Sequence, residues 1–122
     1  MKKILLDSNV FIYSIKQKID IFSSLQDILQ EPFELVTTES VVKELEKMSK
    51  SAKKDSAYAK ASLKLMEKMS VKVIPSKHEY ADKDILALAK EDIVVITNDK
   101  KLKEKLKKKT RVMSLGVIKK IR

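Results

Sequence analysis

The chain has 122 residues, enough to bury one hydrophobic core and too few for two ordinary domains, so we expect a single domain over residues 1–122. It carries 27 lysines and arginines against 17 aspartates and glutamates, a formal net charge of +10, which favours RNA or another polyanion as its partner. The absence of cysteine excludes disulfide frameworks and thiolate metal sites, and no stretch resembles a signal peptide or a membrane span. We therefore expect a cytoplasmic protein without membrane contact. The alternative explanation of the positive net charge is a surface that is merely rich in lysine.

Short apolar runs alternate with segments of helical period along the whole chain. The expected strands are, in order, Lys3–Asp7, Glu34–Thr37, Val71–Ile74, Ile93–Thr97 and Arg111–Leu115. Apolar residues at three- and four-residue spacing predict helices around residues 41–48, 58–69 and 82–90. This alternation is typical of an α/β fold, a parallel sheet of about five strands with helices on both faces. The single glycine, Gly116, excludes glycine-rich phosphate loops and with them P-loop NTPases and dinucleotide-binding proteins.

Carboxylates follow the ends of two predicted strands. Asp7 closes the apolar run Ile4–Leu6, and Asp99 closes the run Ile93–Asn98. The carboxyl ends of parallel strands meet at one edge of a sheet, so these two side chains should converge there. Each aspartate also stands where a helix is expected to begin, and a helix N-cap is the alternative role.

Other acidic residues lie in the predicted helices. Glu44 and Glu46 flank the apolar face of one helix at opposite margins, and helical geometry does not choose between them. Asp82 and Asp84 are two residues apart near the start of another helix, so only one should face the cleft unless the helix begins between them. The segment Ser76–Glu79, which contains the only histidine, has the pattern of a helix capping box. Several carboxylates in a basic protein suggest a divalent metal ion held against a polyanionic substrate.

Four short motifs resemble, in order and position, those of the PIN-domain family of ribonucleases. They are Ile4–Ile12, Thr38–Leu45, Tyr80–Leu86 and Ile96–Asp99. Each is short and degenerate, so the specificity of the resemblance lies in the set, which spans nearly the whole chain. The second motif selects Glu44 over Glu46, and the third selects Asp82 over Asp84.

The resemblance implies a three-layer α/β/α sandwich whose clustered carboxylates bind Mg²⁺ or Mn²⁺ and hydrolyse RNA. The implied metal-binding and catalytic acids are Asp7, Glu44, Asp82 and Asp99, with Asp84 as a further candidate ligand. Hard divalent ions prefer carboxylate oxygen, and two of them can activate a water and stabilise both reacting oxygens of a phosphodiester. Neighbouring polar residues are expected to orient these acids by hydrogen bonds: Ser8, Asn9, Thr97 and Asn98.

The end of the fourth motif points to a branch of the family. The sequence Thr97–Asp99 followed by two lysines resembles the rRNA-processing branch more than the toxins of toxin–antitoxin pairs. A toxin with an antitoxin partner and a catalytically silent RNA-binding domain are the alternatives, and the sequence leaves a homodimer open. A lysine-rich helix next to the acids is expected to contact the RNA backbone, through Lys100, Lys101, Lys103, Lys105 and Lys107. Its alternative role is a solvated helix face.

Overall fold

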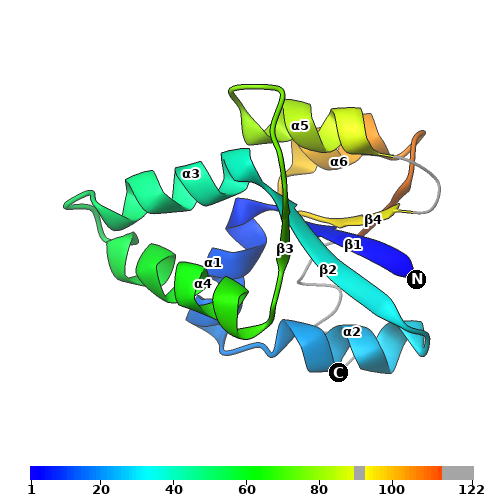
Figure 1. Ribbon diagram of the computed structural model, residues 1–122, viewed down its shortest axis with the longest axis horizontal. Coiled ribbons are helices and arrows are strands. Elements are labelled where there is room, and N and C mark those ends of the chain that lie inside the picture. The colour runs from blue at the N-terminus through cyan, green and yellow to red at the C-terminus, as the bar shows by residue number, and fades with distance from the viewer. Residues whose placement is uncertain (90–92, 114–122) are drawn as a thin grey trace.

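The computed structural model describes residues 1–89 and 93–113. In this part of the chain, five parallel strands form one sheet in the order β3-β2-β1-β4-β5, with six helices packed on its two faces (Figure 1). The strands are β1 (Lys2–Leu6), β2 (Phe33–Thr38), β3 (Lys72–Ile74), β4 (Ile93–Ile96) and β5 (Arg111–Met113). The helices are α1 (Ser8–Gln17), α2 (Ile21–Leu29), α3 (Glu39–Ser49), α4 (Ser56–Lys68), α5 (Ala81–Leu88) and α6 (Lys100–Leu106). The predicted three-layer α/β/α architecture is confirmed.

The two layers of helices bury opposite faces of the sheet. Alternation along β1 sends Ile4 and Leu6 to one face and Leu5 to the other. The larger core packs the first face against α1 to α4, and the smaller core packs the second face against α5 and α6 (Figure 1). All four residues of β4 are buried, as expected for a central strand covered on both faces.

The strands β1 and β4 end at the same level of the sheet. Leu6 pairs with Ile96 in the register of the two strands, and the N–H of Asp7 donates to the Ile96 carbonyl at 3.2 Å. Asp7 and Thr97 therefore leave the sheet side by side at its carboxyl edge. The first predicted strand boundary was one residue too long, because Asp7 is the N-cap of α1.

The predicted capping box at Ser76–Glu79 is wrong, because α5 begins only at Ala81. Ser76 instead caps a distant helix: its Oγ accepts the N–H of Ser40 at 2.8 Å, and its N–H donates to Glu39 Oε1 at 2.8 Å. The loop before α5 is thus fastened to the first turn of α3. The predicted ends of α5 at Lys90 and of β5 at Leu115 fall outside the described residues. Among the residues that the structure describes, no helix is long and apolar enough to cross a bilayer.

Candidate functional site

Asp7 is held rigidly at the carboxyl end of β1. Its Oδ1 accepts the N–H of Ser8 at 2.8 Å, and its Oδ2 accepts the Thr97 hydroxyl at 2.8 Å and the Asn9 side-chain amide at 3.2 Å. Only 6% of the residue is exposed. The N-cap role weighed from the sequence is real, and three of the four residues expected to orient the acids contact this one carboxylate.

The surroundings of Asp7 raise the pKa of its carboxyl group. Burial raises its pKa, and the hydrogen bonds from Thr97 and Ser8 counteract this only in part. The carboxylates of Asp99 and Asp82 raise the pKa further. Two acids from other elements therefore lie close enough for their charge to be felt at the end of β1.

Asp99 stands at the end of the neighbouring strand, as the N-cap of α6. Its Oδ1 accepts the N–H groups of Lys101 at 2.9 Å and Leu102 at 3.2 Å, and the residue is exposed. Its own N–H donates to Thr97 Oγ1 at 3.1 Å. The Thr97 hydroxyl therefore connects the two strand-end aspartates, since it donates to Asp7 and accepts from Asp99.

The fourth predicted supporting residue acts one step further out. The N–H of Asn98 donates to Asn9 Oδ1 at 3.0 Å, and the amide of Asn9 in turn donates to Asp7. This chain of contacts ties the β4–α6 turn to the first turn of α1. Asn98 thus helps to fix the orientation of a residue that contacts the carboxylate.

Glu44 brings a third acid to this edge from α3. Partial burial of its carboxyl raises its pKa, a hydrogen bond with the Ser8 side chain lowers it, and the charges of Asp7 and Asp82 raise it. The structure therefore brings Glu44, the glutamate that the motif resemblance selects, near Asp7 and Asp82.

Asp82 and Asp84 face different surroundings, although both lie in the first turn of α5. Asp82 is exposed, and its charge acts on Asp7 and Glu44. Asp84 is only 3% exposed and accepts the Ser40 hydroxyl. The two carboxylates therefore point to different sides, as helical geometry requires of residues two apart.

Asp84 is saturated by donors from the loop before α5. Its Oδ1 accepts the N–H groups of Lys77 at 3.2 Å and His78 at 3.0 Å. Burial alone would raise the pKa of Asp84, but hydrogen bonds from Ser40, Ser76 and these two N–H groups lower it below its ordinary value. The geometry gives Asp84 the task of holding this loop against α3.

The acids at this edge suit a hydrated divalent ion better than an ion that needs an enclosing cage of protein ligands. Within residues 1–89 and 93–113, no three acidic or histidine side chains converge closely enough to enclose an ion. Mg²⁺ keeps several waters and is commonly bound through one or two carboxylates together with substrate phosphate, so it does not need such a cage. The carboxylate oxygens of Asp7 and Glu44, which lie near other acids, therefore fit a hydrated divalent ion.

The predicted RNA-binding lysines surround the outer side of α6. Of the five, four are exposed, and Lys103 is half-buried. Lys107 is paired with Glu104 at 2.9 Å, within the same helix region. Asp99 is the N-cap of this helix, so this positive surface is adjacent to the acidic edge.

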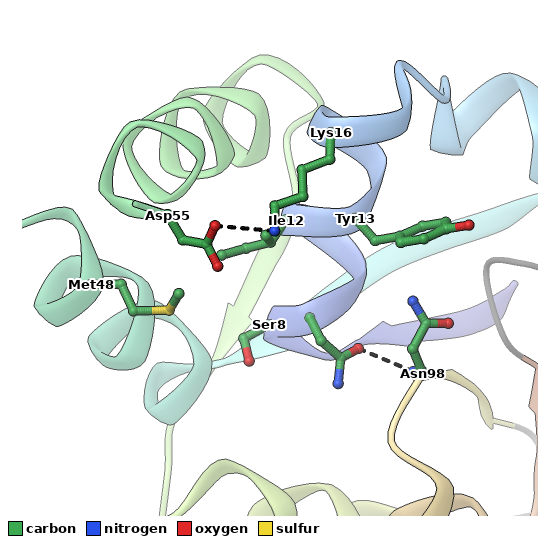
Figure 2. A pocket seen from close by; sticks show the side chains of 8 residues that line it. Ser8, Ile12, Tyr13, Lys16, Met48, Asp55 and Asn98 are labelled. Carbon is green, nitrogen blue, oxygen red and sulfur yellow. Dashed lines mark hydrogen bonds and ion pairs between the residues drawn. The ribbon is translucent and has the colours of Figure 1, made fainter. Parts of the chain in front are cut away.

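A cavity beside the acids was missed from the sequence. It measures about 370 Å³ and adjoins the first turn of α1 (Figure 2). Its lining residues are Ser8, Asn9, Ile12, Tyr13, Lys16, Met48, Asp55 and Asn98. The first five share one face of α1 at helical spacing, a signal present in the sequence, but the other walls come from three separate segments.

Comparison with known proteins identifies the family. Residues 4–117 match the family model described as a PIN like domain. The chain belongs to the PIN-domain ribonuclease family. Within this family, it is 38% identical over 109 residues to ribonuclease VapC4 of Methanocaldococcus jannaschii, covering 87% of this chain and 83% of the relative. It is 35% identical over 104 residues to ribonuclease VapC9 of Archaeoglobus fulgidus, covering 84% and 74%.

Solved structures of the family share the fold. The PIN domain endonuclease Utp24 superimposes with a TM-score of 0.77 at 25% identity, over 92% of this chain and 84% of that one. VapBC-1 from nontypeable Haemophilus influenzae gives a TM-score of 0.63 at 18% identity, over 93% and 98%. The second likeness concerns the fold alone.

Proposed function

We propose that this PIN-domain protein is a divalent-metal-dependent ribonuclease that hydrolyses RNA phosphodiester bonds at the carboxyl edge of its sheet. The observation that carries the proposal is that acids from four elements lie near one another: burial is the main cause of the raised pKa of Asp7 and Glu44, and the charges of neighbouring acids raise both further. The proposed ligands of Mg²⁺ or Mn²⁺ are Asp7, Glu44, Asp82 and Asp99. Two relatives named as ribonucleases support RNA as the substrate.

Each part of the surrounding structure has a task in this proposal. When bound, the ion supplies a nucleophilic water and neutralises charge on the scissile phosphate. Thr97 and Asn9 orient the Asp7 carboxylate, and the Ser8 side chain orients Glu44. Asp84, considered from the sequence as a further ligand, acts here as a positioning residue that fixes the loop leading into α5.

The test is cleavage of a mixed RNA pool by the purified protein with Mg²⁺ or Mn²⁺ and with chelator. Glu44→Gln should lower the rate by roughly a hundredfold or more, as loss of a group that acts on the transition state does. Glu46→Gln is the matched control, because it makes the same change on the same helix and should leave the rate unaltered. Cleavage that persists in EDTA, or equal losses in both variants, contradicts the proposal.

The biological role has two candidates. The motif ending in Asp99 favours processing of rRNA or other cellular RNA in the cytoplasm. The shared name VapC of the two relatives, and the VapBC assemblies with the same fold, favour a toxin held by an antitoxin protein. Expression of the chain in a host cell separates these roles: growth arrest that is relieved by the product of a neighbouring small gene identifies the toxin.

A further inference from the structure

The cavity beside the acidic edge has the position of a substrate subsite. Ser8 directly follows Asp7, and Asn98 directly precedes Asp99, and both line the cavity. Figure 2 shows Tyr13 and Asn98 on one side and Met48 and Asp55 on the other, with α1 between them. If the phosphate of an RNA strand lies at the acids, the nucleotide next to that phosphate can therefore reach this cavity.

A second hollow continues the cavity away from the acids. It measures about 380 Å³ and shares Lys16, Met48 and Asp55 with the first. The residues that it adds are Ser51, Lys53 and Lys54. Lys53 and Lys54 are exposed, so the second hollow is basic even though Asp55 forms an ion pair with Lys16 at 3.0 Å. Together, the two hollows form a groove that leads from the acids to a positive surface.

The walls of the first hollow match the chemistry of a nucleobase. Ile12, Tyr13 and Met48 offer apolar surface for the flat faces of a ring. Hydroxyl and amide groups from Ser8, Asn9 and Asn98 line the same space, where the polar edge of a base would lie. A volume of about 370 Å³ is within the usual range of ligand pockets, and aromatic side chains commonly stack on the bases of single strands.

We infer that this pocket binds a base of single-stranded RNA next to the scissile phosphate, with Tyr13 as its stacking surface. Lys53 and Lys54 then contact one backbone phosphate each beyond this base, because phosphate contacts supply most of the affinity that is independent of sequence. The inference rests on the proposed ribonuclease function, whose substrate it narrows to RNA that is unpaired beside the cut. The inference also implies that the RNA runs over α1 and the α3–α4 turn, in addition to its expected contact with the lysines of α6.

The test compares two labelled probes, a single-stranded hexa-adenylate and an abasic ribose-phosphate hexamer of equal length, bound in EDTA so that metal-dependent cleavage is suppressed. The wild-type protein should bind the hexa-adenylate about tenfold more tightly, the ratio that stacking of one base gives. Tyr13→Phe, which keeps the ring, should preserve this ratio. Tyr13→Leu should reduce it to within about twofold, and a thermal melt identifies any loss that comes from unfolding.

A second pair of variants tests the basic hollow. Replacing Lys53 and Lys54 with alanine should weaken both probes equally and reduce the slope of log affinity against log salt by about 1.4, roughly 0.7 for each lost contact with a single strand. Lys60 and Lys64 are exposed lysines of α4 that line neither hollow, so their double alanine variant is the control of equal charge. Equal loss of slope in the two double variants places the phosphate path elsewhere.

The outcomes separate this inference from the proposed function. Equal affinity for the two probes in the wild-type protein, or an unchanged ratio in Tyr13→Leu, overturns the base pocket even if RNA is cleaved. A tenfold ratio that depends on Tyr13, in a protein that cleaves nothing, supports the pocket and contradicts the nuclease proposal. Failure to bind either probe also overturns the pocket.

Discussion

The Thr97 hydroxyl donates a hydrogen bond to Asp7 Oδ2 at 2.8 Å and so joins residues 90 positions apart in the chain. Thr97 is fully buried, and it belongs to the turn that leaves β4 beside β1. Its side chain therefore sets the orientation of Asp7, the most enclosed of the four proposed metal ligands.

Thr97→Val should raise the pKa of Asp7 further. The hydrogen bond from Thr97 stabilises the ionised carboxylate, so its removal favours the protonated form. Carbon-detected NMR titration of the Asp7 carboxyl in metal-free protein measures this change directly. The variant should also lose about 1–2 kcal/mol of unfolding free energy, because the N–H of Asp99 loses its acceptor as well. An Asp7 pKa that falls or stays constant would show that this hydroxyl does not stabilise the carboxylate.

Asp7→Asn should abolish cleavage and leave the fold slightly more stable without metal. Burial and the neighbouring acids raise the pKa of Asp7, so its ionised form is disfavoured in the folded state. Its contribution to stability is fully present below the pKa of an unfolded aspartate and is lost as the pH rises through the higher folded value. Asparagine is also a good N-cap, and removing the charge should stabilise the protein by about 1 kcal/mol near neutral pH. Urea unfolding in EDTA, from acid to neutral pH, measures the change in stability. If the variant still cleaves RNA, the role of Asp7 is that of a helix cap alone.

Asp82→Ala and Asp84→Ala should affect different properties, metal binding in the first variant and stability in the second. Asp84 binds the loop before α5, so its replacement should cost about 2–3 kcal/mol of unfolding free energy by leaving buried donors unpaired. The pKa of Asp84 is lowered, so its contribution is present above the unfolded value and disappears as the pH falls through the folded one. The cost should therefore shrink in acid.

Asp82→Ala should leave stability nearly unchanged and weaken Mn²⁺ binding, because Asp82 is exposed and acts on Asp7 and Glu44 through its charge. Isothermal calorimetry with Mn²⁺ and unfolding curves of both variants provide the comparison. Normal Mn²⁺ affinity in Asp82→Ala, beside loss of affinity in a folded Asp84→Ala, would reverse the assignment of the two residues.

The lysines of α6 should contribute to RNA affinity without affecting the metal. Replacing Lys100, Lys101 and Lys105 by glutamine should reduce the salt dependence of RNA binding by about 0.7 per lost phosphate contact with a single strand. All three are exposed, so stability should change little. Calorimetry with Mn²⁺ in the absence of RNA is the control, and an unchanged salt slope would remove α6 from the RNA path.

Local patterns in the sequence determined the layers of this fold and the position of its acids. Apolar runs such as Ile93–Ile96 predict buried parallel strands because a strand covered on both faces needs apolar residues at every position. Asp7 and Asp99 each stand where a strand has ended and a helix begins, and a few neighbouring residues are enough to predict both boundaries. The motif around Glu44 selected the glutamate that the structure places beside Asp7.

Only the tertiary structure decided which distant groups meet. Ser76 looked like the cap of the next helix but caps α3, and Asp84 finds the Ser40 hydroxyl 44 positions away. The walls of the cavity beside α1 likewise come from four segments of the chain. Periodicity reports only whether a residue faces the core or the solvent, whereas these contacts depend on the order β3-β2-β1-β4-β5 and on the loops that this order brings together. The sequence therefore predicted which acids lie at this edge of the sheet, and the packing of separate elements decided which groups hold them and which lie beside them.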